Sequence, residues 1–226
     1  MATMAALGSS APERILRPRE LNRALLARQF LLERTAATPL EVVERLIGLQ
    51  AQAVHAPYTG LWTRIADFSP KALSRLLLDR RVVRIALMRG TVHLVTAADA
   101  LELRPLMQPV FERPIVGGTP YGRALAGVDL QQIVDRARAL VEEQPRTNTE
   151  LRALLGEHWP DVDPGALTFL VRHRLACVQV PPRGVWGAKG QLRVTTAEAW
   201  LGRPLSEEPS AEVLVERYLA AYGPAS

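Results

Sequence analysis

Apolar side chains recur every three or four positions in four stretches before residue 80. This spacing is typical of helices that bury one face. Thr38 is followed by Pro39, and Ser69 by Pro70, so each pair supplies an N-cap residue and a proline suited to the first helical turn. The pattern therefore predicts helices over residues 20–33, 40–49 and 58–66, and a fourth that begins at Pro70.

β-Branched residues become frequent after these helices. They occupy much of residues 82–88 and 91–95, on either side of Arg89 and Gly90. A glycine at this turn can adopt the positive φ that a tight β-hairpin requires. Helices followed by a hairpin form the order of a winged-helix domain. The sequence therefore predicts one such unit, with its wing near residues 82–95.

The same order recurs further along the chain. Helices are predicted over residues 129–142 and 147–156 and from Asp163 onward, and strands at 177–180 and 191–196 flank a second wing at 181–190. Residues 210–222 match the first helix of a third unit. We therefore expect a mainly α fold with small β-hairpin wings, an α+β protein built from tandem winged-helix motifs.

These repeats divide the chain into four segments. Residues 1–19 are expected to form a disordered or partly ordered tail, residues 20–124 a first winged-helix unit with a connecting helix, residues 125–205 a second unit, and residues 206–226 the start of an incomplete third. The chain stops just after Gly223 and Pro224, where a helix-stop signal is followed by a fresh start signal. We interpret this end as a truncated sequence or an incomplete gene model.

The charge of the chain raises the question of a nucleic-acid partner. The net charge is +5, and only Lys71 and Lys189 among the 28 basic residues are lysines. The planar guanidinium of arginine suits phosphate, so an arginine-rich surface is a common footprint of DNA binding. An arginine-rich chain is also what GC-rich coding produces, and 23 acidic residues are interleaved with the arginines. Composition alone therefore leaves DNA binding and a solvated surface equally open.

Cysteine and histidine usage narrows the chemistry. Cys177 is the only cysteine, which excludes an internal disulfide and a multi-cysteine zinc site, and the four histidines lack a metal-binding spacing. The sequence has no stretch that is long and apolar enough to span a bilayer, and its start lacks the pattern of a signal peptide. We expect a cytoplasmic protein with no metal and no cofactor.

Two glutamines stand out at the end of the second predicted helix. Gln50 falls where the apolar stripe of that helix would continue. On a helix, Gln50 and Gln52 would lie on roughly opposite faces, whereas on an extended segment they would share one face. If the helix ends near Leu49, the two carboxamides converge. The alternative is that Gln50 braces the helix end through backbone hydrogen bonds and Gln52 is merely solvated.

Two histidines near these elements have both functional and ordinary explanations. His55 lies three residues past the glutamines and is a candidate to orient or accept a proton, although an exposed loop histidine often has no role. His93 alternates with Val92 and Leu94 along a strand and therefore points to the opposite face. A cross-strand hydrogen bond is the ordinary explanation for His93.

Three stretches together resemble the AlkZ/YcaQ-type family of winged helix-turn-helix DNA glycosylases. They are Gln-Ala-Gln at 50–52, Pro-Tyr-Thr-Gly-Leu-Trp at 57–62 and Arg-Gly-Thr-Val-His-Leu-Val at 89–95. They follow the order of the family, and the resemblance runs from about Leu21 to the C-terminus. In that family a Gln-hydrophobic-Gln or Gln-hydrophobic-Asp motif is catalytic, and the whole protein has three winged helices and a C-terminal β-barrel around the DNA. This sequence has the first form of the motif but lacks most of the third unit and the barrel.

The resemblance implies a monofunctional DNA glycosylase that hydrolyses the N-glycosidic bond of alkylated purines, of the N7-alkylguanine type, in double-stranded DNA. It leaves open whether interstrand crosslinks are also substrates. N7-alkylation gives the base a positive charge, so the leaving group needs no proton and the enzyme needs no strong base. Gln50 and Gln52 would then position a water and face the developing positive charge of the sugar, with His55 as a weaker catalytic candidate. The absence of a lysine near the motif argues against Schiff-base lyase chemistry.

Candidate DNA contacts lie around the two wings and on the helix before the second wing, where such folds meet phosphates. They are Arg81, Arg84, Arg89, Thr91, His93, Arg172, Arg174, Arg183, Lys189 and Arg193. Each charged residue among them has an alternative role as a solvated surface charge.

Two rival functions remain open. One is a non-enzymatic DNA-binding protein, a transcription regulator or architectural factor in which the glutamines are structural. Regulators usually dimerise to match half-sites, and the sequence has no heptad segment for this, so we expect a monomer associated with the nucleoid. The other is a set of winged helices used only for protein contacts, which predicts no salt-dependent DNA affinity.

Overall fold

The N-terminal part of the chain forms four helices, as predicted, in a computed structural model that describes residues 17–223. Thr38 caps the second helix in a capping box with Glu41, and a proline follows the cap. Three of these helices end earlier than predicted, at Arg28, Arg45 and Trp62. The chain turns through positive φ at Phe30 after the first and at Ile47 and Gly48 after the second. The helices are α1 (Pro18–Arg28), α2 (Pro39–Arg45), α3 (Ala56–Trp62) and α4 (Pro70–Leu78).

Three strands follow or interrupt these helices. The strands β2 (Val82–Ala86) and β3 (Val92–Thr96) form the predicted hairpin, and a short 3₁₀ turn, η1 (Met88–Gly90), joins them. Arg89 and Gly90 both take positive φ in this turn. β1 (Leu49–Gln50) pairs with β3 on the outer side. The first hairpin is therefore confirmed, and it carries an extra outer strand.

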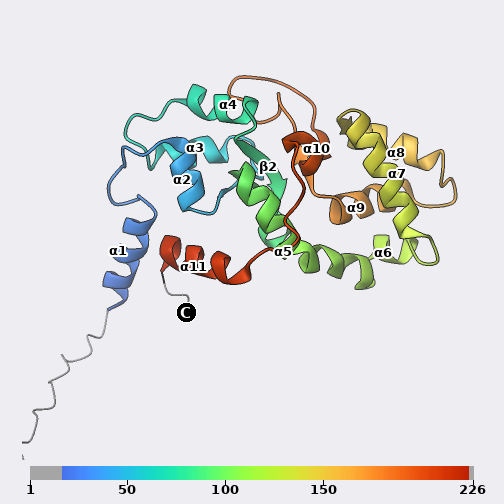
Figure 1. The fold of residues 1–226 in the computed structure, drawn as a ribbon, viewed down its shortest axis with the longest axis horizontal. Helices are drawn as coiled ribbons and strands as arrows, with labels where there is room; N and C mark the ends of the chain where they lie inside the picture. The colour runs from blue at the N-terminus through green and yellow to red at the C-terminus, as the bar shows by residue number, and fades with distance from the viewer. Residues whose placement is uncertain (1–16, 224–226) are drawn as a thin grey trace, which may run out of the picture.

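Two helices connect the hairpin to the second half of the chain: α5 (Ala97–Val116) and α6 (Pro120–Ala124). Thr96 caps α5, which contains prolines at 105, 109 and 114. Figure 1 shows α5 crossing the middle of the molecule, with α1 to α4 on one side and α6 to α9 on the other. The sequence predicted only that some connecting helix would occupy this stretch.

The second half repeats the arrangement of the first. Asp129, Thr147 and Asp163 cap the helices that the sequence predicted to begin there. The second predicted hairpin is also confirmed, and a short outer strand again pairs with its last strand. The elements are α7 (Leu130–Glu143), β4 (Arg146–Thr147), α8 (Asn148–Gly156), α9 (Pro164–Arg174), β5 (Cys177–Gln179), β6 (Arg193–Thr196), α10 (Ala197–Leu201) and α11 (Ala211–Tyr222).

The two hairpins belong to one continuous sheet, which the sequence analysis did not expect. The strand order is β1-β3-β2-β5-β6-β4, and the strands pair antiparallel throughout. The join lies between β2 and β5, where Arg84 pairs with Gln179 and Ile85 with Val178. The two hairpins are therefore joined through β2 and β5, and the α+β class holds. We call residues 39–96 the first unit and residues 130–196 the second unit.

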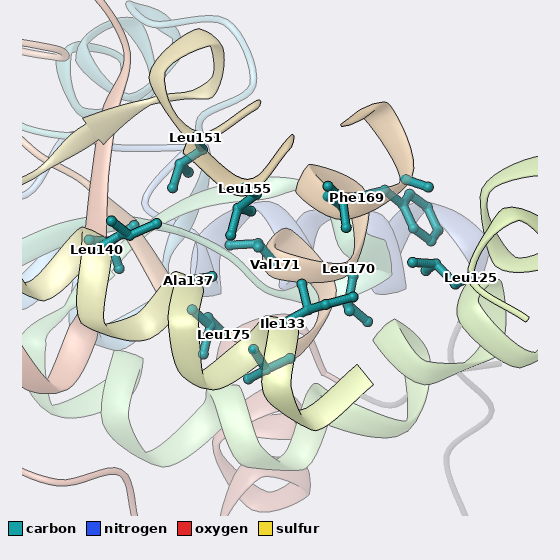
Figure 2. Close-up of a cluster of buried hydrophobic side chains, with 14 of the residues drawn as sticks. Leu125, Ile133, Ala137, Leu140, Leu151, Leu155, Phe169, Leu170, Val171 and Leu175 are labelled. Carbon is teal, nitrogen blue, oxygen red and sulfur yellow. The ribbon is translucent and has the colours of Figure 1, made fainter. Parts of the chain in front are cut away.

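Apolar side chains gather in three clusters that follow this arrangement. One lies within the first unit around α2, α3 and α4, one joins α5 to both hairpins, and one fills the second unit between α7, α8 and α9. Figure 2 shows the last of these, with Ile133, Leu155 and Leu170 pointing toward one another. Each unit therefore has its own core, and α5 and the sheet bind the two units together.

The predicted domain boundaries stay predictions. The tail expected at residues 1–19 lies almost entirely outside the described residues, as does the chain end after Gly223. The helix expected to open a third unit is present as α11, capped by Ser210. Among residues 17–223, no helix combines the length and the hydropathy needed to cross a bilayer.

Candidate active site and nucleic-acid interface

The two glutamines lie at the outer edge of the sheet. Gln50 ends β1 and pairs with His93 of β3, and the amide of Ala51 continues the pairing by donating to the Val92 oxygen at 2.7 Å. The side chain of Gln52 then accepts a hydrogen bond at its Oε1 atom from the Val92 amide, at 3.2 Å. Both glutamines are exposed. The helix end predicted near Leu49 comes earlier, since α2 ends at Arg45, and the extended stretch covers only Leu49 and Gln50, with Gln52 in the bend that follows. We call residues 50–54 the glutamine loop.

The turn before β1 sets the register of this edge. Gly48 has a φ of +98°, and a Cβ atom there would lie 2.5 Å from Val95 Cγ1 and 2.8 Å from the Leu94 oxygen. A larger residue would therefore push β1 away from β3. Glycine at position 48 lets the chain pass close to β3 and leave the helix direction within two residues.

A groove of about 590 Å³ opens beside the glutamine loop. Gln52 lines it, together with Arg89 and Gly90 of the first wing and Arg172 and His173 of α9. Gln50 does not belong to its lining. The groove therefore brings one candidate catalytic residue together with arginines from both units, while the convergence of both carboxamides on one water stays a prediction.

His55 lies in a different hollow, of about 300 Å³. Its neighbours there are Val54 and five residues of the second wing, which are Arg183, Gly184, Ala188, Lys189 and Gly190. The His55 ring also lies 5.5 Å from the Trp186 ring, measured between centroids. The structure therefore places His55 against the second wing and away from the groove that Gln52 lines.

The second wing folds back onto the first unit. The Tyr58 hydroxyl donates to the Gly184 oxygen at 2.7 Å and lies 3.0 Å from the Ser74 Oγ atom, which also accepts from the Trp186 amide at 3.0 Å. Figure 1 shows this segment, the orange loop near α4, crossing from one half of the molecule to the other. Burial raises the pKa of Tyr58. No sequence pattern indicated this contact. The second wing was expected to project toward DNA instead.

Arg84 was expected at the DNA surface, and the structure corrects this. The residue is only 2% exposed. Its Nη2 atom donates to the Ala51 oxygen at 2.7 Å, its Nη1 to the Val54 oxygen at 3.4 Å, and its Nε to Gln179 Oε1 at 3.1 Å. The alternation of β2 placed this side chain on the inner face, under the glutamine loop. Burial, aided by the nearby Arg183, lowers the pKa of Arg84 to about 10.

His93 is also buried, with 5% of its surface exposed, so it does not offer the DNA contact that was expected. Its Nδ1 atom lies 2.9 Å from the Thr91 oxygen. Burial lowers the pKa of His93, and the charge of Arg89 adds to the effect. The neighbouring Thr91 hydroxyl donates to the Met88 oxygen within the turn. His93 therefore supports the first wing from inside, whereas Thr91 is half-buried in the turn.

Some of the remaining basic candidates form ion pairs with carboxylates, and others are exposed to solvent. Arg193 donates through both Nη atoms to Glu150, at 2.9 Å each, and Arg174 Nε lies 2.8 Å from Glu112. Arg183 is half-buried in the second wing. The exposed candidates are Arg81, Arg89, Arg172 and Lys189, and of these Arg89 and Arg172 line the groove. The groove therefore offers two exposed guanidinium groups for phosphate.

The described residues contain no group of three metal-ligating side chains that could hold an ion. Burial raises the pKa of the Cys177 thiol to about 12, which keeps the thiol protonated and unreactive at neutral pH. The polar groups that line the groove include the carboxamide of Gln52, the arginines Arg89 and Arg172, and the ring of His173.

Comparison with known proteins decides the family. A sequence profile described as DNA glycosylase AlkZ-like matches residues 43–226. The chain belongs to the AlkZ-like DNA glycosylase family. The matched AlkZ-like region contains the glutamine loop, the groove and both wings. A comparison with curated protein sequences finds no match.

A solved structure shows that the fold is shared. The AlkZ-like chain superposes on Streptomyces sahachiroi DNA glycosylase AlkZ with a TM-score of 0.69 and 23% sequence identity, over 92% of this chain. At this identity the similarity establishes the fold. The alignment spans 58% of the length of the Streptomyces protein. The predicted family and α+β fold class are thus confirmed, while the roles of individual residues stay predictions.

Proposed function

We propose that this AlkZ-like protein is a monofunctional DNA glycosylase that hydrolyses the N-glycosidic bond of N7-alkylated purines in double-stranded DNA. The observation that carries the proposal is the position of Gln52 in a groove that also presents Arg89 and Arg172. Family membership supports glycosylase chemistry, and the two arginines support a phosphate backbone as the ligand. Interstrand crosslinks at N7 of guanine belong to the same substrate class.

The proposed reaction needs a placed water more than a strong base. An N7-alkylated purine is already cationic, so its bond to the sugar breaks without protonation of the base. Gln52 Oε1 accepts one hydrogen bond from Val92, which orients the carboxamide. The two N–H groups on Nε2 can then donate to a water, while the second lone pair on Oε1 accepts from that water or faces the positive charge that develops on the sugar. Gln50, exposed on the adjoining strand, is proposed as the second polar group.

The other parts of the sequence prediction are refined as follows. His55 lies in the hollow beside the second wing, and we therefore assign it no step in the reaction. Arg89 and Arg172 are proposed to bind phosphates, with Arg81 and Lys189 as outer contacts. The protein is proposed to act as a monomer, without a metal or an organic cofactor, on DNA of the nucleoid.

The second candidate function, non-enzymatic DNA binding, is favoured by one observation. The hydrogen bond between Gln52 and Val92 also extends the pairing of β1 with β3. In a regulator or architectural protein, this structural role would be sufficient for Gln52. The two functions therefore differ in whether Gln52 matters beyond folding.

The deciding experiment measures release of N7-methylguanine from duplex DNA under single-turnover conditions. We expect Gln52→Ala and Gln50→Ala to slow excision by roughly tenfold to a thousandfold, the range for loss of one preorganised polar contact to a transition state. DNA affinity should hardly change, because a carboxamide carries no charge. Gln131→Ala is the matched control, since Gln131 is an exposed glutamine on α7, where its side chain contacts Asp135. If both loop variants excise at the wild-type rate, the catalytic assignment fails and the non-enzymatic function takes its place.

A further inference from the structure

We propose that Arg84 is a positioning residue that holds the glutamine loop from below, and that Gln179 of the second unit holds Arg84 in turn. This inference rests on the proposed function of Gln52. It assigns to the buried join between the two units a role in the geometry of the active site.

The contacts of Arg84 bracket Gln52 along the chain. Its Nη2 atom donates to the oxygen of Ala51, one residue before Gln52, and Nη1 donates to the oxygen of Val54, two residues after it. The planar guanidinium presents these donors in one rigid fork. Gln52 is therefore carried on a loop whose two flanks are tied to the same buried side chain. Its own bond to the Val92 amide ties it to β3 as well.

A purely structural role would not require a cation at position 84. Removing a charge from water costs several kcal/mol unless its hydrogen bonds are well satisfied, and Arg84 is 2% exposed. Within residues 17–223, its hydrogen-bond partners are two loop oxygens and Gln179, and no carboxylate is among them. A leucine would fill a core position at lower cost. The donors of Arg84 are thus directed at the loop rather than at a counter-ion.

The second unit completes this arrangement. Arg84 and Gln179 pair across the join between β2 and β5, and they occupy equivalent positions in the two units, because Arg84 pairs with Leu94 and Gln179 with Val194. The turn of the second wing closes over the stem of Arg84. A Cβ atom at Gly184 would lie 2.7 Å from Arg84 Cδ. Arg84 therefore links the second unit to the glutamine loop.

The expected consequence is sensitivity of the reaction to small shifts of the loop. Displacement of a catalytic group by about 1 Å can reduce a rate by roughly a hundredfold. We therefore expect Arg84→Met to slow single-turnover excision at saturating DNA by roughly tenfold to a hundredfold. Arg84→Lys keeps the charge but offers a single point of attachment, so its rate should fall between those of Arg84→Met and the wild type.

A double-mutant cycle distinguishes positioning from general destabilisation. If Arg84 acts through Gln52, then Arg84→Met should cost little further rate when Gln52 is already alanine, since the two losses are not additive. A merely structural effect would reduce the rate by the same factor in both backgrounds, and that result would overturn the proposal. Arg146→Met is the matched control, because Arg146 donates from its Nε atom to the Leu140 oxygen in the second unit, away from the loop.

A second measurement needs no activity. Hydrogen exchange of the Ala51 amide, which is bonded to Val92, reports directly on the loop. It should be faster in Arg84→Met and unchanged in Arg146→Met. If Arg84→Met does not fold, Gln179→Met serves instead, because it removes only the acceptor of Nε. If the Ala51 amide exchanges at the wild-type rate in the variant that folds, Arg84→Met or Gln179→Met, the positioning role is overturned. Faster exchange in a chain that excises no base would uphold the positioning role and reject the proposed function.

Discussion

The two outer strands of the sheet occupy equivalent places and have different chemistry. β1 pairs with β3 as β4 pairs with β6, so that Gln50 corresponds to Thr147 and His93 to Arg193. Each outer strand has two residues and lies at an end of the strand order. The two outer strands therefore share their pairing and differ in their side chains.

In the second unit the outer strand is closed by internal contacts. Thr147 caps α8 in a capping box with Glu150, whose carboxylate also binds both Nη atoms of Arg193. In the first unit the chain instead bends after Ala51. Helix α3 then begins after His55, whose side chain does not cap the helix. Gln52 is exposed in the bend. The second unit thus uses its outer edge for its own stability, whereas the first unit presents the carboxamide of Gln52 to the groove.

The largest effect is expected from altering the turn that precedes β1. Gly48→Ala should lower the free energy of unfolding by about 1–3 kcal/mol, because alanine is strained at positive φ and its Cβ meets β3. The shift of β1 should also slow base excision by roughly a hundredfold. Chemical denaturation and single-turnover excision measure the two effects. The control is Gly127→Ala, where φ is also positive but a Cβ meets no atom within 4 Å. Equal rates in the two variants would show that the register of β1 is unimportant for catalysis.

The next effect concerns the arginines of the two units. Arg172→Gln should weaken DNA binding by roughly tenfold, the value of one hydrogen bond to a charged group, and should lower the salt slope of log affinity by about one. Arg193→Gln serves as the control, since Arg193 is already paired with Glu150. Titrations at several salt concentrations measure both. A larger loss for Arg193→Gln than for Arg172→Gln would reverse the proposed division between open and paired arginines.

A smaller effect, on the pH dependence of stability, is expected at His93, which pairs with the outer strand of the first unit. Burial lowers the pKa of His93, so below a pH of about 6.5 the unfolded chain takes up a proton that the folded chain resists. The stability due to the neutral ring is complete above the unfolded pKa and is lost as the pH falls through the folded pKa. The denaturant concentration at the unfolding midpoint should therefore decrease when the pH is lowered from 7.5 to 5. The decrease should be smaller in His93→Gln. An identical pH dependence in that variant would contradict the burial of a neutral ring.

The smallest effect is expected at the outer strand of the second unit. Glu150→Gln removes the ion pair with Arg193, but both side chains are more than a third exposed. Surface pairs of this kind contribute little, so only a slight fall in the thermal midpoint is expected, with no change in excision. A marked loss of excision here would show that the second unit's edge also serves the reaction.

Several parts of the fold were predictable because their causes are local. Thr38, Asp129 and Thr147 each accept a backbone hydrogen bond within three residues of their own position, so cap and helix start are visible in a short stretch of sequence. The hairpins follow from β-branched residues on either side of a turn. Where the prediction was wrong, as at the end of α2, periodicity had outweighed the signal of Gly48.

The sequence by itself determined where most helices begin and where both hairpins lie, and it singled out Gln50 and Gln52 after a helix, although only Gln50 lies on a strand. Only the tertiary structure decided that β2 pairs with β5, that Arg84 is buried beneath the loop, and that the second wing rests on Tyr58. Strand pairing across the join and the burial of a charge depend on groups about a hundred residues apart, such as Arg84 and Gln179. No local propensity encodes such a contact, because its free energy exists only once both units have folded against each other.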